Sequence, residues 1–163
     1  MSWGQQQQQG WGNQYNSNLF NPNQNYQIVT ALDDDRVLDI SQANNATKFQ
    51  TILWSKNGDP NQVFRFRQVA NGKYAITCGT GATLQVPNNS SANGTQLLGG
   101  QAHNNISEAF EVYPSQNVQG GYIIKAFNNK VLDCFEGKSS KGNSVIQWDY
   151  NGGKNQTWFI KPF

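Results

Sequence analysis

The feature that most constrains this 163-residue chain is a pattern that occurs three times. The form Tyr-x-Ile recurs in two steps of 48 residues, at positions 26–28, 74–76 and 122–124. Each copy later reaches a triplet that ends in an aromatic residue, at positions 62–64, 108–110 and 156–158. Such self-similarity indicates one structural unit copied three times. Units of this size must pack together to bury a shared core.

Within each copy, short apolar runs are separated by turn residues, and no helical period extends over a useful length. The runs cover residues 26–28, 37–40, 52–54 and 63–66 in the first copy, and 122–124, 131–135, 145–148 and 157–160 in the third. The runs contain β-branched and aromatic residues, and the gaps carry Asn-Gly, Gly-Gly or Asn-Asn turns. The sequence therefore predicts an all-β fold of about twelve strands. Closure with threefold pseudo-symmetry would remove its exposed strand edges.

The first 25 residues differ from the rest of the chain. They contain no charged residue and have Asn or Gln at 13 positions. Four aromatic residues are distributed among these polar residues, namely Trp3, Trp11, Tyr15 and Phe20. Such tracts bury too little surface to fold alone, although they can self-associate. We expect either a disordered tail or docking of its aromatic residues on the domain or on a neighbouring subunit, which would give a homo-oligomer. Residues 26–163 are predicted to form one domain with repeats at about 26–70, 71–118 and 119–163.

Charge is sparse, at 13% of residues against roughly 25% in an ordinary domain. A net charge of +2 without a basic cluster argues against nucleic acid and anionic lipid as partners. No apolar stretch reaches the roughly 20 residues that cross a bilayer, so membrane insertion is not expected. His103, the only histidine, has no nucleophile motif near it, and no metal or cofactor is predicted. An amide- and hydroxyl-rich surface suits partners that offer many hydrogen bonds and little charge.

The N-terminus has neither a basic start nor a hydrophobic run, so no secretory signal peptide is expected. Asn155 begins an Asn-Gln-Thr glycosylation signal, and a glycan there would obstruct the site described below. Both observations favour the cytoplasm or export by an unconventional route. Cys78 and Cys134 occupy non-equivalent places in their repeats, which leaves two reduced thiols or one bridge between repeats as alternatives.

Two copies carry an acid, an indole and an amide at the same spacings, 15 residues and then seven. They are Asp39, Trp54 and Asn61 in the first copy, and Asp133, Trp148 and Asn155 in the third. The second copy has Gln85, Gly100 and Ser107 at these positions, although it keeps apolar framework residues such as Leu84 and Phe110. Ordinary drift of turn residues is one explanation. Their joint loss beside a preserved framework instead favours a polar site in copies one and three.

This trio has the chemistry of a sugar site. A carboxylate accepts two charge-assisted hydrogen bonds, an amide both donates and accepts, and an indole face attracts polarised C–H groups. Together they fit a pyranose with neighbouring hydroxyls on one edge and C–H groups on one face. Galactose-type sugars fit best, because their axial 4-hydroxyl leaves the C3–C4–C5–C6 face open for stacking.

The triplets Gln62-Val63-Phe64 and Gln156-Thr157-Trp158 resemble the QxW motif of the ricin B-chain type lectins, as does the run from Val145 to Trp158. The resemblance covers residues 26–163 and implies a β-trefoil, a six-stranded barrel capped by three hairpins with one shallow pocket per repeat. The sequence departs from the family in three ways, because it lacks the disulfides within repeats, the motif of the second repeat and the secretion signal.

The resemblance also implies a role for each matching residue. Asp39 and Asp133 would accept bonds from adjacent sugar hydroxyls, Trp54 and Trp148 would stack, and Asn61 and Asn155 would bond a ring hydroxyl. Gln62 and Gln156 would brace the aspartates from behind, and backbone groups near Gln42 and Glu136 would complete the pockets.

The sequence therefore predicts a non-catalytic lectin with two sites for galactose- or N-acetylgalactosamine-containing glycans. Asp39 and Asp133 would lie on different repeats, so they could not flank one glycosidic bond as hydrolysis requires. Two alternatives stay open. One is a protein-interaction trefoil with decayed sugar sites, and the other is a stand-alone module that binds polysaccharide. The choice between the two galactose forms depends on the loops at residues 41–45 and 136–141.

Overall fold

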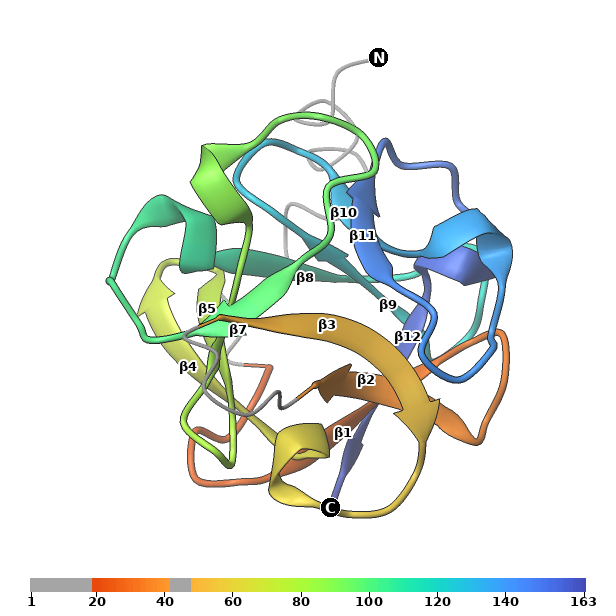
Figure 1. Cartoon of the computed structure of the whole chain (residues 1–163), viewed down its shortest axis with the longest axis horizontal. Helices are drawn as coiled ribbons and strands as arrows, with labels where there is room; N and C mark the ends of the chain where they lie inside the picture. The colour runs from red at the N-terminus through yellow and green to blue at the C-terminus, as the bar shows by residue number, and fades with distance from the viewer. Residues whose placement is uncertain (1–18, 42–47) are drawn as a thin grey trace.

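The computed structural model describes residues 19–41 and 48–163, which form twelve β-strands (Figure 1). The first repeat contributes β1 (Tyr26–Thr30), β2 (Arg36–Ile40), β3 (Lys48–Ser55) and β4 (Phe64–Ala70). The second contributes β5 (Lys73–Cys78), β6 (Thr83–Gln85), β7 (Leu98–Gly100) and β8 (Phe110–Pro114). The third contributes β9 (Tyr122–Lys125), β10 (Val131–Cys134), β11 (Val145–Trp148) and β12 (Trp158–Pro162). No helix within the described ranges is long and apolar enough to span a bilayer.

Six of the strands close into a barrel. Antiparallel pairing runs from β1 to β4, then through β5, β8, β9 and β12, and returns from β12 to β1. The other six strands form three hairpins, β2–β3, β6–β7 and β10–β11, one from each repeat. Every barrel strand therefore has two neighbours, which leaves no open edge in the barrel. The predicted all-β, threefold β-trefoil is confirmed.

Short 3-10 turns join these strands at equivalent points. One precedes the last strand of each repeat: η3 (Pro60–Gln62), η5 (Ile106–Glu108) and η7 (Lys154–Gln156). Two more, η4 (Pro87–Asn89) and η6 (Phe135–Gly137), follow β6 and β10. The strand expected to extend to Phe135 ends at Cys134, because the chain turns there to enter η6. The second repeat therefore keeps both backbone turns of the third repeat.

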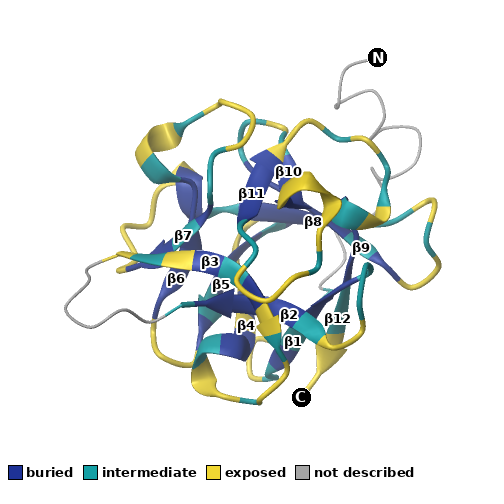
Figure 2. Ribbon diagram, turned by 45° about the vertical axis from the view of Figure 1, so that its right-hand side comes forward, coloured by how far each residue is buried: buried dark blue, intermediate teal, exposed yellow. Residues whose placement is uncertain are grey.

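The core repeats with the same symmetry. Equivalent side chains from the three repeats are fully buried, namely Ile28, Ile76 and Ile124, Leu38, Leu84 and Leu132, and Phe64, Phe110 and Trp158. Figure 2 shows this buried interior surrounded by exposed loops. Each such side chain contributes roughly 1.5–3 kcal/mol by leaving water, so all three repeats stabilise one common core. Cys78 and Cys134 are buried free thiols.

Phe20, from the Asn/Gln-rich segment, also belongs to the core and is only 5% exposed. Its ring stacks on Phe66 at 4.2 Å and lies 5.4, 5.3 and 6.3 Å from the rings of Tyr26, Tyr74 and Tyr122. These tyrosines begin the three Tyr-x-Ile motifs, so Phe20 lies among equivalent residues of all three repeats. The described part of the segment, residues 19–25, is thus attached to the barrel.

Candidate functional site

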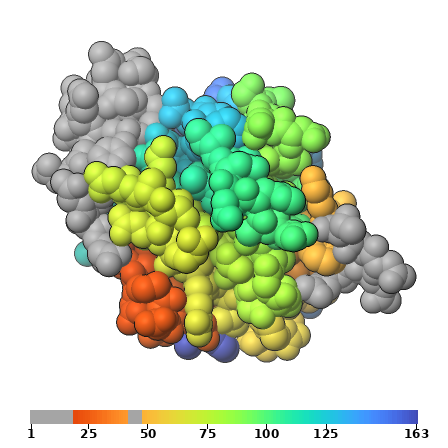
Figure 3. All heavy atoms as spheres, turned by 90° about the vertical axis from the view of Figure 1, so that its left-hand side faces the viewer, coloured from red at the N-terminus to blue at the C-terminus, as the bar shows by residue number. Residues whose placement is uncertain are grey.

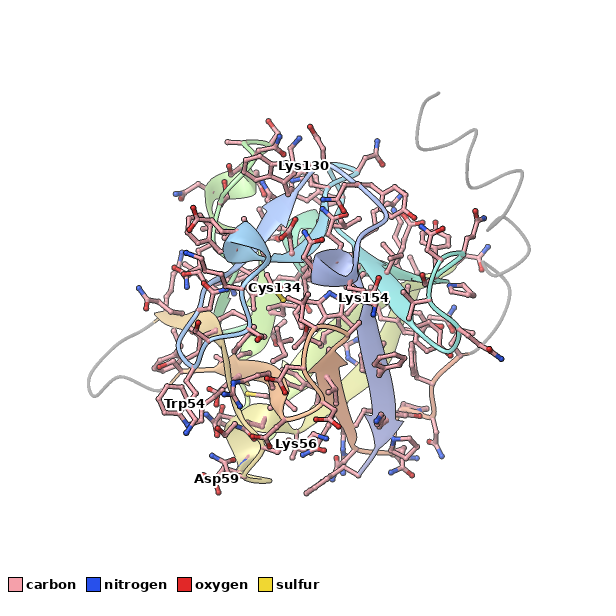
Figure 4. All side chains as sticks on the ribbon, turned by 90° about the vertical axis from the view of Figure 1, so that its right-hand side faces the viewer. Trp54, Lys56, Asp59, Lys130, Cys134 and Lys154 are labelled. Atoms are coloured by element: carbon pink, nitrogen blue, oxygen red, sulfur yellow. The ribbon has the colours of Figure 1, made fainter. Side chains whose placement is uncertain are left out.

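The first repeat brings its acid, indole and amide to one hollow of about 370 Å³. The hollow is lined by Asp39, Trp54 and Asn61, together with Ser41, Asn57 and Asp59. Asp39 comes from β2, Trp54 from the facing strand β3, and Asn61 from turn η3. The Nδ2 atom of Asn61 donates to Oδ1 of Asp39 at 2.8 Å. Trp54 and Asp59 lie together at the lower left of Figure 4.

The third repeat has a second hollow of about 360 Å³ with the same arrangement. It is lined by Asp133, Trp148 and Asn155, together with Phe135, Glu136 and Asn151. The Nδ2 atom of Asn155 lies 3.1 and 3.2 Å from the two carboxylate oxygens of Asp133. Cys134 and Lys154, labelled in Figure 4, are the chain neighbours of Asp133 and Asn155.

A buried glutamine holds each aspartate from behind. Gln62 Nε2 donates to Asp39 Oδ2 at 2.9 Å and to the Ser55 carbonyl at 2.9 Å, while its Oε1 accepts from the backbone N–H of Asn57. Gln156 makes the same three contacts, with Asp133, with the Asp149 carbonyl and with the N–H of Asn151. Each glutamine thus ties an aspartate to the base of its hairpin.

The aspartates keep acceptor capacity toward the hollows. An ionised carboxylate has about four lone-pair positions. Asn61 and Gln62 donate to separate oxygens of Asp39, so the remaining positions can accept hydroxyl groups from a ligand. Burial raises the pKa of both Asp39 and Asp133 above the ordinary value of 3.8, and the hydrogen bonds from the glutamine and asparagine partly oppose this rise. For Asp39, the nearby charge of Asp59 raises the pKa further.

Both indoles are exposed enough to serve as platforms, at 40% each. Each lies beside a loop from a neighbouring repeat. Lys141 Nζ lies 5.8 Å from the centroid of the Trp54 ring, and the N–H of Gly142 donates to the Leu53 carbonyl. In the third repeat, Asn93 exchanges two hydrogen bonds with Asp149, the residue after Trp148. Sequence comparison within one repeat gave no signal for these cross-repeat contacts.

The second repeat keeps the framework contacts, but Gln85, Gly100 and Ser107 stand at the positions of the acid, the indole and the amide (its face fills most of Figure 3). Glu108 replaces the bracing glutamine, and its carboxylate accepts from the N–H groups of His103 and Asn104 at 2.8–2.9 Å. Gln85 replaces the aspartate and donates to the carbonyl of Gln101 at 3.5 Å. Two side chains therefore share the backbone contacts that one glutamine makes elsewhere, and Gly100 supplies no ring.

The structure brings together eight of the ten predicted site residues as two matching groups of four: Asp39, Trp54, Asn61 and Gln62, and Asp133, Trp148, Asn155 and Gln156. Glu136 lies at the rim of the third-repeat hollow, paired with Lys138 at 3.2 Å. Gln42 lies outside the described residues. Ser41 lies in the loop that was expected to influence the choice between the galactose forms, and it lines the first-repeat hollow. Sequence reasoning missed other lining residues, namely Asn57, Asp59, Phe135 and Asn151. Among the described side chains, no group of three His, Cys, Asp or Glu could hold a metal ion.

A closed threefold barrel with hairpin caps defines the β-trefoil class. Within that class, the sequence profile of the ricin-type beta-trefoil lectin domain matches residues 24–158. The chain therefore belongs to the ricin-type β-trefoil lectin family. No curated protein sequence matches the chain closely enough to count as a relative.

Several solved structures share the fold. The designed threefold-symmetric protein ThreeFoil is 26% identical with a TM-score of 0.78, and the match covers 85% of this chain and 99% of that one. A ricin B-like lectin from Macrolepiota procera, solved in complex with lactose, is 23% identical with a TM-score of 0.72, covering 86% and 96% of the two chains. The C-half of an earthworm R-type lectin, in complex with GalNAc, is 22% identical with a TM-score of 0.64, covering 86% and 99%.

Proposed function

We propose that this protein is a non-catalytic lectin that binds galactose- and N-acetylgalactosamine-type glycans through two sites, one in the first repeat and one in the third. The observation that carries the proposal is the acid, indole and amide arrangement, which occurs twice with matched contacts and is missing from the remaining repeat. Family membership and the sugars bound by two similar lectins support the same ligand class.

In the proposed complex, neighbouring sugar hydroxyls donate to the free lone pairs of Asp39 or Asp133. Asn61 or Asn155 contacts one of the same hydroxyls, and the apolar face of the ring stacks on the exposed indole. Exposed hydrogen bonds contribute about 0.5–1.5 kcal/mol each. A few such bonds plus one stacked ring give roughly −4 to −6 kcal/mol, which corresponds to a dissociation constant between millimolar and tens of micromolar.

Two weak sites on different repeats suit a multivalent function. One chain would bridge two glycans, and its strength on a glycan-covered surface would come from engaging several sugars at once. The neutral, amide-rich surface suits such partners, because it does not rely on charge attraction.

Isothermal titration calorimetry with methyl galactoside tests this proposal. We expect a stoichiometry near two for the natural chain and near one for Asp39→Ala or Asp133→Ala, because each change removes the acceptor of one site. Gln85→Ala in the second repeat is the matched control and should leave the value near two. An unchanged stoichiometry in both aspartate variants would refute the assignment of the sites.

Further measurements separate this function from its alternatives. A protein-interaction trefoil would not be retained on immobilised galactose, and its partner would tolerate Asp133→Ala. A polysaccharide-binding module would bind xylan or β-galactan without competition from monosaccharides. A non-catalytic lectin should release no reducing sugar from either galactoside or polysaccharide on prolonged incubation.

A further inference from the structure

The two hollows match in most respects. Their volumes are about 370 and 360 Å³, both indoles are 40% exposed, and both aspartates are 4% exposed. Any difference in the ligands they prefer must therefore come from the chemistry of their walls rather than from their size.

The clearest difference lies two residues after the aspartate. This position is Ser41 in the first repeat and Phe135 in the third, and each side chain lines its hollow. The backbones are equivalent there, because the N–H of Ser41 donates to the Gln50 carbonyl and the N–H of Phe135 donates to the Ser144 carbonyl. The two hollows thus share a backbone position that carries a hydroxyl in one and an aromatic ring in the other.

Phe135 is 41% exposed, although a ring of this size is usually buried. The described residues include six exposed large hydrophobic side chains, and two of them, Phe135 and Trp148, line this one hollow. The Nδ2 atom of Asn143 donates a hydrogen bond to the Phe135 carbonyl at 3.0 Å. Hydrogen bonds at both its N–H and its carbonyl therefore anchor the backbone that carries the Phe135 ring.

We propose that Phe135 is a specificity-determining residue that makes the third-repeat site prefer 2-acetamido sugars, such as N-acetylgalactosamine, over galactose. This inference rests on the proposed function. One pyranose in the hollow presents a face to Trp148 and an edge to Asp133, so a third apolar wall contacts a substituent of the same ring. The acetamido methyl group is the apolar substituent that distinguishes the two sugars. Glu136, at the rim of the hollow, can accept the amide N–H.

Variants that leave one site intact test the inference. Trp54→Ala isolates the third-repeat site, and Trp148→Ala isolates the first. Each is titrated with the methyl glycosides of galactose and of N-acetylgalactosamine. At the third-repeat site we expect about fourfold tighter binding of the acetamido sugar, the factor for removing roughly one methyl group from water. At the first-repeat site we expect a ratio near one.

Phe135→Ser, made in the Trp54→Ala background, installs the residue of the first repeat. It should reduce the ratio to about one, because the acetamido sugar loses more affinity than methyl galactoside does. Ile106→Ser is the matched control, because Ile106 is an exposed hydrophobic residue that does not line this hollow. A thermal unfolding transition verifies that each variant is folded.

The outcomes distinguish this inference from the function on which it rests. Suppose that both isolated sites bind galactoside and that the ratio of affinities for the acetamido sugar and the galactoside is the same at the two sites. The inference is then overturned and the lectin proposal stands. If Phe135→Ser weakens the binding of both methyl glycosides equally, Phe135 does not recognise the acetamido group and the inference is again overturned. If neither isolated site binds either sugar while the natural chain also fails to bind, the proposed function itself is refuted.

Discussion

The second repeat and its two neighbours share a backbone and a core but divide their polar contacts differently. In the third repeat, Gln156 holds the hairpin base and, together with Asn155, the buried Asp133. In the second, Glu108 accepts the backbone N–H of His103, and Gln85 donates toward the carbonyl that corresponds to that of Asp149. The hairpin can therefore be held without an acid facing outward. This comparison separates what the fold needs from what a ligand needs.

The largest effect on stability is expected when the side chain that holds the base of a hairpin is removed. Gln156→Ala removes one donor from Asp133, which keeps Asn155, and leaves the Asn151 N–H and the Asp149 carbonyl without the glutamine partner. The free energy of unfolding should therefore fall by about 3–5 kcal/mol. Glu108→Ala should cost about 2–3 kcal/mol, because two backbone N–H groups lose their acceptor. Urea denaturation measures both values.

Asn155→Ala is the matched control for Gln156→Ala. Asn155 contacts Asp133 but holds no backbone group in the contacts described above, so its removal should cost less than about 1 kcal/mol of stability while weakening sugar binding. If Asn155→Ala were as destabilising as Gln156→Ala, the proposed separation between framework and site would fail.

The sequence predicted the fold because the apolar runs, the turn residues and the 48-residue repeat all agree on one architecture. The repeat also located Asp39 and Asp133, since a repeat that lacks the acid identifies it as dispensable for folding. Phe20 was assigned to the low-complexity segment by composition, although it packs in the core, because its contacts with Tyr74 and Tyr122 are non-local.

The additional lining residues of the hollows could not be predicted for a related reason. Phe135 continues an apolar run, and only the turn into η6 takes it out of the strand and into the wall of a hollow. The contact of Lys141 with Trp54 depends on how the repeats meet around the barrel, which spacing within one repeat does not encode.

As pH falls, the aspartates of the first and third repeats should raise the stability of the protein but lower its affinity for sugar. Burial raises the pKa of Asp39 and Asp133 in the folded chain. Between the ordinary value of 3.8 and the raised value, the folded state holds more protons than the unfolded state. The contribution of these groups to the free energy of unfolding therefore increases as pH falls through this window.

Sugar affinity should fall through the same window, because a protonated carboxyl loses its charge and part of its acceptor capacity. Calorimetry and urea denaturation at matched pH values measure the two trends. The double variant Asp39→Asn, Asp133→Asn is the control and should lose this component of the pH dependence of unfolding. A parallel decline of stability and affinity with falling pH in this window, absent from the control, would contradict the assignment of these aspartates as buried acceptors.

The smallest expected effect comes from restoring the aspartate and its bracing glutamine in the second repeat. Gln85→Asp with Glu108→Gln gives this repeat the aspartate and bracing glutamine found in its neighbours, on a backbone that has the same turns as the third repeat. We still expect two bound sugars per chain in calorimetry, because Gly100 offers no ring for stacking and Ser107 replaces the amide of Asn61 and Asn155. A base–aromatic stack is worth about 1–3 kcal/mol, and a sugar stack of similar size would make up much of the weak affinity proposed for each site. A third bound sugar would mean that the carboxylate alone defines a site, and the indole would then be an accessory rather than a requirement.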